Sequence, residues 1–147
     1  MTLTTLRARL GSGTVIFHHA LDGVDVTLQN VCVAGMPDGL HGFHIHERGD
    51  LTNGCASMGS HYDPERALRH GGLHSTRRHG GDLGNVRSRA GCVENVTIHA
   101  PQLTLAEVRG RGLVLHERED DLGRGGTHES HTTGSAGARI ACGRIHE

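Results

Sequence analysis

Tryptophan and lysine are absent from this chain of 147 residues, and aromatic side chains are scarce, with two phenylalanines and one tyrosine. A hydrophobic core must therefore be built mainly from aliphatic residues. No run of 18 apolar residues occurs, so no segment resembles a transmembrane helix. The first residues also lack the charged and apolar regions of a signal peptide. We therefore expect a soluble, cytoplasmic protein without a membrane partner.

An excess of charge of either sign is also absent, because the formal net charge is −1 with neutral histidine. Binding to a phosphate backbone favours a broad basic surface, so this balance argues against nucleic acid as a partner. The length suffices for one compact domain and leaves no room for a second with a sizeable core. We expect a single domain that spans residues 1–147.

Glycine and histidine, by contrast, are abundant, with 23 and 14 residues. Segments of β-type composition recur between glycine-rich turns. The eight strands that they predict are residues 3–10, 13–20, 24–34, 40–47, 83–89, 92–99, 112–117 and 139–145. Helical periodicity is limited to one turn at residues 65–69, so the pattern predicts an all-β barrel or sandwich. Two long loops, residues 48–82 and 118–138, are the expected functional segments.

Two histidines lie two residues apart in one predicted strand. A strand sends alternate side chains to the same face, so His44 and His46 would present both imidazoles together. Neutral imidazole is the commonest metal ligand in proteins. Alternatively, the pair could be solvated on an exposed strand, and His41 adds little to the pattern.

The first long loop brings His61, His70, His79 and Asp82 within 22 residues. Three imidazoles and one carboxylate form a ligand set that suits tetrahedral zinc. The alternative is a polar loop that is merely rich in histidine. His116 ends a later predicted strand, where a barrel could bring it near His44 and His46, although spacing in sequence does not establish that proximity.

Several motifs occur together and in order between about residue 10 and residue 145. They are Gly42-Phe-His-Ile-His-Glu-Arg-Gly-Asp50, Asn53-Gly-Cys55, His70-Gly-Gly72, Gly81-Asp-Leu-Gly-Asn-Val86, His116-Glu117, Asp120-Asp-Leu-Gly-Arg-Gly-Gly126 and Gly137-Ala-Arg-Ile-Ala-Cys-Gly143. In these residues the chain resembles the copper/zinc superoxide dismutase family. The resemblance implies an eight-stranded Greek-key β-barrel or sandwich with a zinc and disulfide loop and an electrostatic loop.

The resemblance also implies the cofactors and their ligands. Copper would be held by His44, His46, His61 and His116. Zinc would be held by His61, His70, His79 and Asp82. His61 would therefore bridge the two metals, with an open position on copper for substrate and a closed, structural zinc site.

The activity implied by the resemblance is dismutation of superoxide to O2 and hydrogen peroxide by alternate reduction and reoxidation of copper. Arg139 would attract the superoxide anion, and His61 would carry a proton to the product. Asp120 would accept hydrogen bonds from His44 and His70. Cys55 and Cys142 would form the family's disulfide, and a copper chaperone is a candidate partner.

Some features depart from the family. One extra residue lies between His61 and His70, and a bulge is expected at residues 65–69. Arginines occupy three positions of the apolar two-fold interface of dimeric relatives. They are Arg48, Arg109 and Arg144. Because like charges would meet across the axis, we expect a monomer or a dimer through another surface.

The two remaining cysteines, Cys32 and Cys92, have no counterpart motif and are expected to be unpaired thiols in strands. Two alternative functions stay open. One is a catalytically weak dismutase-like protein that binds copper or acts as a decoy. The other is a histidine-rich structural zinc protein.

Overall fold

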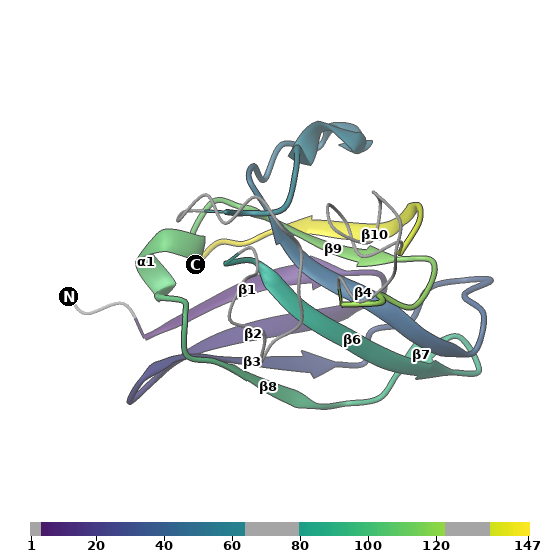
Figure 1. The fold of residues 1–147 in the computed structure, drawn as a ribbon, viewed down its shortest axis with the longest axis horizontal. Helices are drawn as coiled ribbons and strands as arrows, with labels where there is room; N and C mark the ends of the chain where they lie inside the picture. The colour runs from purple at the N-terminus through teal and green to yellow at the C-terminus, as the bar shows by residue number, and fades with distance from the viewer. Residues whose placement is uncertain (1–3, 64–79, 123–135) are drawn as a thin grey trace.

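The computed structural model describes residues 4–63, 80–122 and 136–147, which form two antiparallel β-sheets facing each other (Figure 1). The first sheet has the order β1 (Thr5–Leu10), β2 (Gly13–Ala20), β3 (Gly23–Gln29), β8 (Thr97–Ala100). The second has the order β10 (Arg139–Arg144), β9 (Gly112–His116), β4 (Gly39–His46), β6 (Asp82–Arg89), β7 (Cys92–Val93). The connections hold β5 (Thr52–Cys55), the 3-10 helix η1 (Ala56–Met58) and α1 (Leu105–Val108).

The expected all-β, barrel-like class is therefore confirmed, with differences in detail. The predicted strand 24–34 ends earlier, because β3 stops at Gln29. The predicted strand 92–99 is two short strands, because Asn95 accepts a hydrogen bond from the backbone of Asn30 at 3.0 Å, where the chain passes from one sheet to the other. The strand β5 and the helix α1 are additional. The helical turn and bulge expected at 65–69 lie outside the described residues.

The core lies between the sheets and consists of residues that alternate along their strands. On the first sheet, Phe17 and Val26 are fully buried, while on the second Phe43 and Ile45 face them from β4. Both phenylalanines of the chain are thus in the core, and the rest of the cluster is mostly aliphatic. Period-two alternation leaves the opposite face of β4 available for His44 and His46, which alternate with these residues.

The two sheets are joined along one edge by the end of the chain. Arg7 of β1 and His146 exchange two backbone hydrogen bonds, of 2.7 and 2.9 Å. Closure of this kind pairs backbone groups that an open sheet edge would leave exposed. No helix among the described residues has the length and apolar character needed to cross a membrane.

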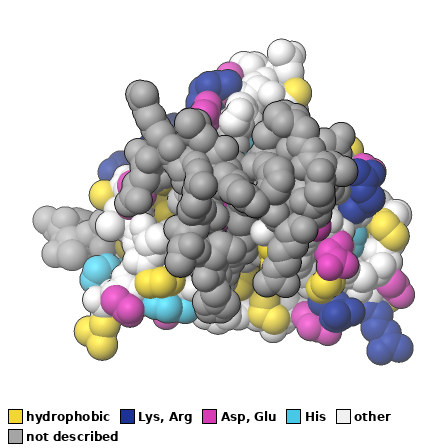
Figure 2. All heavy atoms as spheres, in the orientation of Figure 1, with side chains coloured by type: hydrophobic (Ala, Val, Ile, Leu, Met, Phe, Trp, Pro, Cys, Tyr) yellow, Lys and Arg dark blue, Asp and Glu magenta, His cyan; other side chains and the backbone are white. Residues whose placement is uncertain are grey.

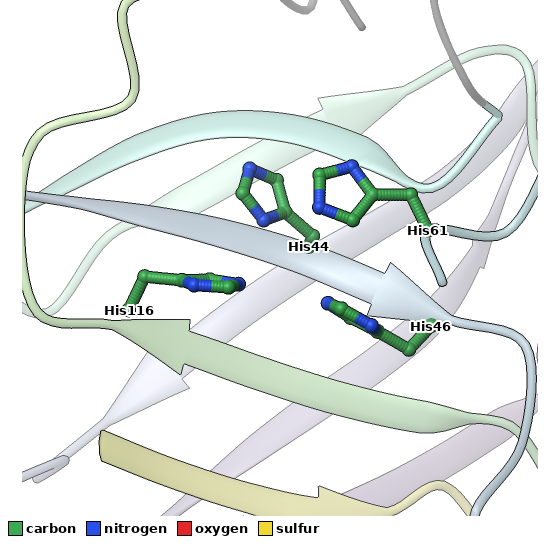
Figure 3. A group of neighbouring side chains, drawn as sticks. All are labelled: His44, His46, His61 and His116. Atoms are coloured by element: carbon green, nitrogen blue, oxygen red, sulfur yellow. The ribbon is translucent and has the colours of Figure 1, made fainter. Parts of the chain in front are cut away.

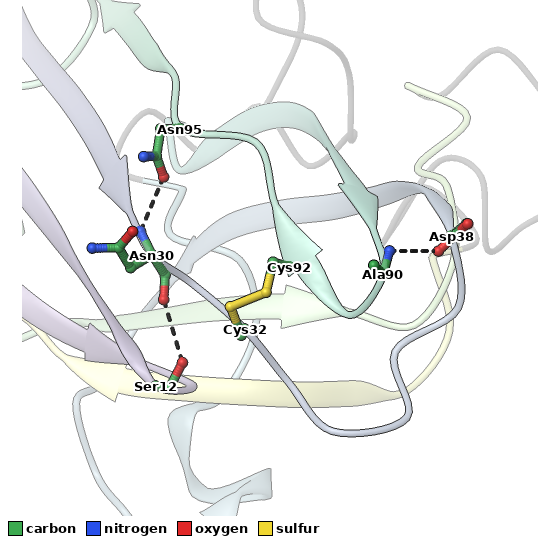
Figure 4. Close-up of a disulfide and its surroundings, with 7 residues drawn as sticks. All are labelled: Ser12, Asn30, Cys32, Asp38, Ala90, Cys92 and Asn95. Atoms are coloured by element: carbon green, nitrogen blue, oxygen red, sulfur yellow. Dashed lines mark hydrogen bonds between the residues drawn. A yellow bond between two sulfur atoms is a disulfide. The ribbon is translucent and has the colours of Figure 1, made fainter.

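At another edge a disulfide between Cys32 and Cys92 joins the segment after β3 to β7 (Figure 4). The expectation of two unpaired thiols was therefore wrong. The two residues face each other in an antiparallel bridge, beside a backbone hydrogen bond of 2.7 Å from Val93 to Val31. This register, set by the whole fold, brings together cysteines that are 60 residues apart in sequence.

Removing this disulfide is expected to destabilise the protein without altering its fold. For a loop of 60 residues, the chain-entropy model gives a loss of about 4 kcal/mol in the free energy of unfolding. Urea denaturation of the double variant Cys32→Ser/Cys92→Ser, against the unaltered oxidised protein, measures this loss. Equal stability, together with free thiols in the unaltered protein, would contradict the pairing.

Candidate metal centre

The centre begins on β4, where His44 and His46 lie on the face opposite the core residues Phe43 and Ile45. Both histidines are almost completely buried, with 0% and 1% relative exposure. Their ring centroids are 6.3 Å apart. Strand alternation therefore places the two imidazoles side by side, as the sequence predicted.

Two further histidines reach the same space from other segments (Figure 3). His61 forms an isolated bridge with His46, and its ring centroid lies 4.1 Å from that of His44. His116 ends β9, and its ring centroid lies 4.8 Å from that of His44. One ring nitrogen from each of the four lies within 4.8 Å of the others. The structure thus brings together all four residues that the resemblance implied as copper ligands.

Each of the four rings is oriented by a hydrogen bond at its other nitrogen. His44 Nε2 donates to Asp120 Oδ2 at 2.6 Å, and His61 Nδ1 donates to Asp82 Oδ1 at 2.8 Å. The two other contacts are to carbonyl oxygens: His46 Nδ1 donates to Gly59 and His116 Nδ1 donates to Gly137, both at 2.9 Å. Such contacts fix the orientation of each ring and direct the opposite nitrogen into the common space. In His61 the hydrogen bond to Asp82 would be replaced when zinc binds, because the resemblance implies both groups as zinc ligands.

His46 shows that this arrangement suits a metal. Its Nε2 is buried and has no hydrogen-bond partner among the described residues. The pKa of His46 is lowered from 6.5 to about 2, first by burial, and also by the neighbouring charges of His61 and Arg139. The ring therefore remains neutral at ordinary pH, and a neutral imidazole offers the lone pair that a metal requires.

Of the residues implied as zinc ligands, the structure describes His61 and Asp82. Asp82 begins β6, is completely buried, and contacts His61 on the ring nitrogen that points away from the other three histidines. One nitrogen of His61 therefore faces the other three histidines, and the other nitrogen contacts Asp82. His70 and His79 lie outside the described residues.

Asp120 is held rigidly beside His44. Its side chain is buried and also accepts a hydrogen bond from the backbone of Leu122 at 2.7 Å. The side chain of Asn85 contacts both backbone groups of Asp120, at 2.6 and 2.9 Å. Asn85 was not singled out from the sequence, although it lies inside one of the recognised motifs. The predicted contact between Asp120 and His70 falls outside the described residues.

Arg139 lies next to His116 in the β9–β10 pair. Its guanidinium donates from Nη1 to the Cys55 carbonyl oxygen at 2.7 Å and from Nη2 to the Gly59 carbonyl oxygen at 2.6 Å. The Gly59 oxygen also accepts the hydrogen bond from His46, so one carbonyl group links the arginine to the histidine centre. A disulfide between Cys55 and Cys142, the pair implied by the resemblance, holds the same segment against β10.

His41 is a positioning residue that the sequence analysis named but judged to add little. Its ring is 1% exposed, and Nδ1 donates to the His116 carbonyl oxygen at 2.9 Å. Its Nε2 lies 2.8 Å from the hydroxyl of Ser88 and 2.9 Å from the Pro37 carbonyl oxygen. The sequence could have indicated this role, because His41 lies two residues before Phe43 and alternation sends both side chains to the core. A polar side chain that is buried there needs hydrogen-bond partners.

A ring of backbone hydrogen bonds joins the residues adjacent to the ligands. Ile45 donates to Gly81, Tyr62 donates to Ile45, and Gly81 donates to Tyr62, at 2.8 to 2.9 Å. A side chain on Gly81 would collide with the Ile45 carbonyl oxygen, so this close approach requires glycine. These contacts fix β4, the His61 segment and the start of β6 relative to one another.

Comparisons with known proteins agree with this geometry. A family model described as copper/zinc superoxide dismutase matches residues 11–145. An extracellular Cu-Zn superoxide dismutase of Drosophila melanogaster is 48% identical over 136 residues, which cover 90% of this chain and 74% of the relative. Cu-Zn superoxide dismutase 4 of Dictyostelium discoideum is 46% identical over 145 residues, which cover 96% and 94%.

A solved structure, titled as that of the clock protein EA4, is also similar. It has a TM-score of 0.85 and 37% sequence identity, and the match covers 99% of this chain and 96% of that chain. The likeness therefore extends over nearly the whole fold.

The contact between Asp120 and His44 makes a prediction about metal affinity. Asp120→Asn keeps the shape of the side chain but removes its charge, so metal affinity should fall by roughly tenfold to hundredfold. Zinc affinity should fall before copper affinity if Asp120 also contacts His70, as the resemblance implies. Chelator competition with each metal measures this. Glu119→Gln changes an exposed neighbouring acid and should have no effect. Equal losses in both variants would contradict the assigned role.

Proposed function

The chain belongs to the copper/zinc superoxide dismutase family, and we propose that it dismutates superoxide to O2 and hydrogen peroxide at the histidine centre formed by His44, His46, His61 and His116. One observation carries the proposal: four buried imidazoles from three segments of the fold each direct one nitrogen into a common space, within 4.8 Å of one another. Copper and zinc are the cofactors of this family.

The residues present fit both metals. Four imidazole nitrogens suit copper, and a mixed set of imidazole and carboxylate suits zinc. His44 through Nδ1, and His46, His61 and His116 through Nε2, would hold copper. Asp82 and the Nδ1 of His61 would contribute to zinc, together with His70 and His79 outside the described residues. Bound copper supplies the one-electron chemistry, taking an electron from one superoxide and giving it to a second.

Arg139 would attract and orient the substrate anion. Its guanidinium is partly buried beside His116, and two carbonyl oxygens fix its orientation. A guanidinium carries five N–H donors, so further donors remain for a small oxyanion after these two contacts. The buried Asp120 would hold His44 in place during turnover, and Asp82 would share the ligation of zinc with His61. The proton-carrying role that the resemblance implies for His61 stays a prediction.

Superoxide turnover by protein with measured copper and zinc tests the proposed activity. His116→Ala should lower turnover by more than ~100-fold, because losing a ligand should cost more than losing one of the outer partners. His146→Ala, which changes an exposed histidine at the end of the chain, should leave turnover unchanged. Equal activity in both variants would overturn the site. A fully metallated protein without turnover would favour the weak or decoy copper-binding alternative.

We also propose that the usual two-fold interface of dimeric relatives does not form. Arg48 pairs with Glu47 at 3.3 Å, and Arg109 pairs with Glu147 at 2.8 Å, with the side chains about half exposed. Arg48 and Arg144 line an open groove of about 710 Å³. Three arginines from each copy would meet in one interface, and the pairs within each copy neutralise only part of that charge.

Sedimentation at micromolar concentration is expected to show a monomer of 15.7 kDa, or a dimer that persists in Arg144→Glu. Replacing the three arginines together by glutamine removes the repulsion and should promote self-association. A wild-type dimer that Arg144→Glu dissociates would contradict this proposal.

A cytoplasmic location and loading by a copper chaperone stay predictions. All four cysteines are paired, so both disulfides would have to persist against cytosolic thiols. The similar Drosophila protein is named as extracellular. Whether the four cysteines are oxidised in the protein isolated from its source tests the cytoplasmic location.

A further inference from the structure

The outer face of the first sheet carries a row of possible metal ligands that is separate from the histidine centre. Strand pairing places His18 of β2 opposite Asp25 of β3, and Asp25 opposite His99 of β8. Neighbouring strands are about 4.8 Å apart, so the three side chains stand side by side across the sheet. Figure 2 shows histidine and acidic side chains close together at the lower left, where the β2–β3 hairpin lies in Figure 1.

The burial pattern shows that this row faces solvent. Val24 and Val26, on either side of Asp25, are completely buried, so Asp25 points away from the core. His18 follows the buried Phe17 and is exposed, as is His99, which precedes the buried Ala100. These side chains therefore do not contribute to the core, and their imidazole and carboxylate groups can bind ligands from solvent.

The His99 imidazole already contacts two carboxylates, one in this row and one in the adjacent turn. His99 Nδ1 lies 2.7 Å from Asp25 Oδ1, and His99 Nε2 lies 3.3 Å from Asp22 Oδ1 in the β2–β3 turn. The hydrogen bond with Asp25, together with the charges of both acids, raises the pKa of His99. The electrostatic environment thus favours positive charge at this point of the surface.

We propose that His18, Asp25 and His99, with Asp22 as an additional carboxylate, bind a divalent late first-row transition metal such as Zn²⁺. Two imidazoles flank a central carboxylate, and this nitrogen and oxygen set suits zinc. A divalent cation would displace the proton that Asp22 and Asp25 favour on His99, and the charge of the two carboxylates would then balance that of the cation. His18 and His99 are exposed, so both rings can turn about their side-chain torsions toward the Asp25 carboxylate.

His19 provides a matched control. It is adjacent to His18 and also exposed, but strand alternation directs it to the opposite side, in register with the buried Val24. It has the same residue type on the same strand and lies outside the row. A difference between His18 and His19 variants therefore reports position rather than histidine content.

The test is calorimetric titration of Zn²⁺, at pH 7.5, into protein whose copper and zinc centre is already filled. We expect one additional site, with affinity at least tenfold lower in His99→Ala, His18→Ala and Asp25→Asn and unchanged in His19→Ala. Chemical-shift changes of the His18 and His99 rings on zinc addition provide a second measurement that needs no variant.

No additional binding, or additional binding that His99→Ala and His19→Ala retain equally, would overturn the proposal. The latter outcome would place the ion elsewhere on this histidine-rich chain. Superoxide turnover should be unchanged in His99→Ala. Failure of the proposed dismutase activity and failure of this surface site are therefore distinguishable.

Discussion

The structure depends on one constraint: four imidazoles must each direct one nitrogen to the same buried space. A bare cluster of buried imidazoles lacks compensation for the polar atoms that it takes out of water. Here each ring is held at the nitrogen away from that space, by Asp120 and Asp82 or by the carbonyl oxygens of Gly59 and Gly137. The nitrogens that face the common space are then suited to a metal, which compensates for their burial.

The barrel supports this constraint through backbone contacts next to the ligands. Ile45 lies between two histidines, Tyr62 follows a third, and Gly81 precedes Asp82, and these three residues exchange backbone hydrogen bonds. His41 holds His116 through its carbonyl oxygen. The carbonyl oxygen of Gly59 serves both His46 and Arg139. The groups that would bind metal and attract substrate are therefore positioned by one connected set of contacts.

Features that depend on local alternation along a strand could be predicted from the sequence. Contacts that depend on how distant strands pair could not. Period-two alternation placed His44 and His46 on one face. The approach of His61 and His116 rested on a family resemblance, because spacing along the chain does not define contacts between strands. The pairing of Cys32 with Cys92 was missed for the same reason, since 60 residues separate them. His41 was undervalued because its core-facing register was not used.

The most direct test of the metal centre is a crystal structure of the copper- and zinc-loaded protein with anomalous scattering recorded at both metal absorption edges. We expect copper bound by His44 Nδ1 and by the Nε2 atoms of His46, His61 and His116. Zinc should lie on the opposite side of the His61 ring, bound by Nδ1 and by Asp82. A copper ion outside the four histidines, or a His61 ring that contacts neither metal, would contradict the assignment.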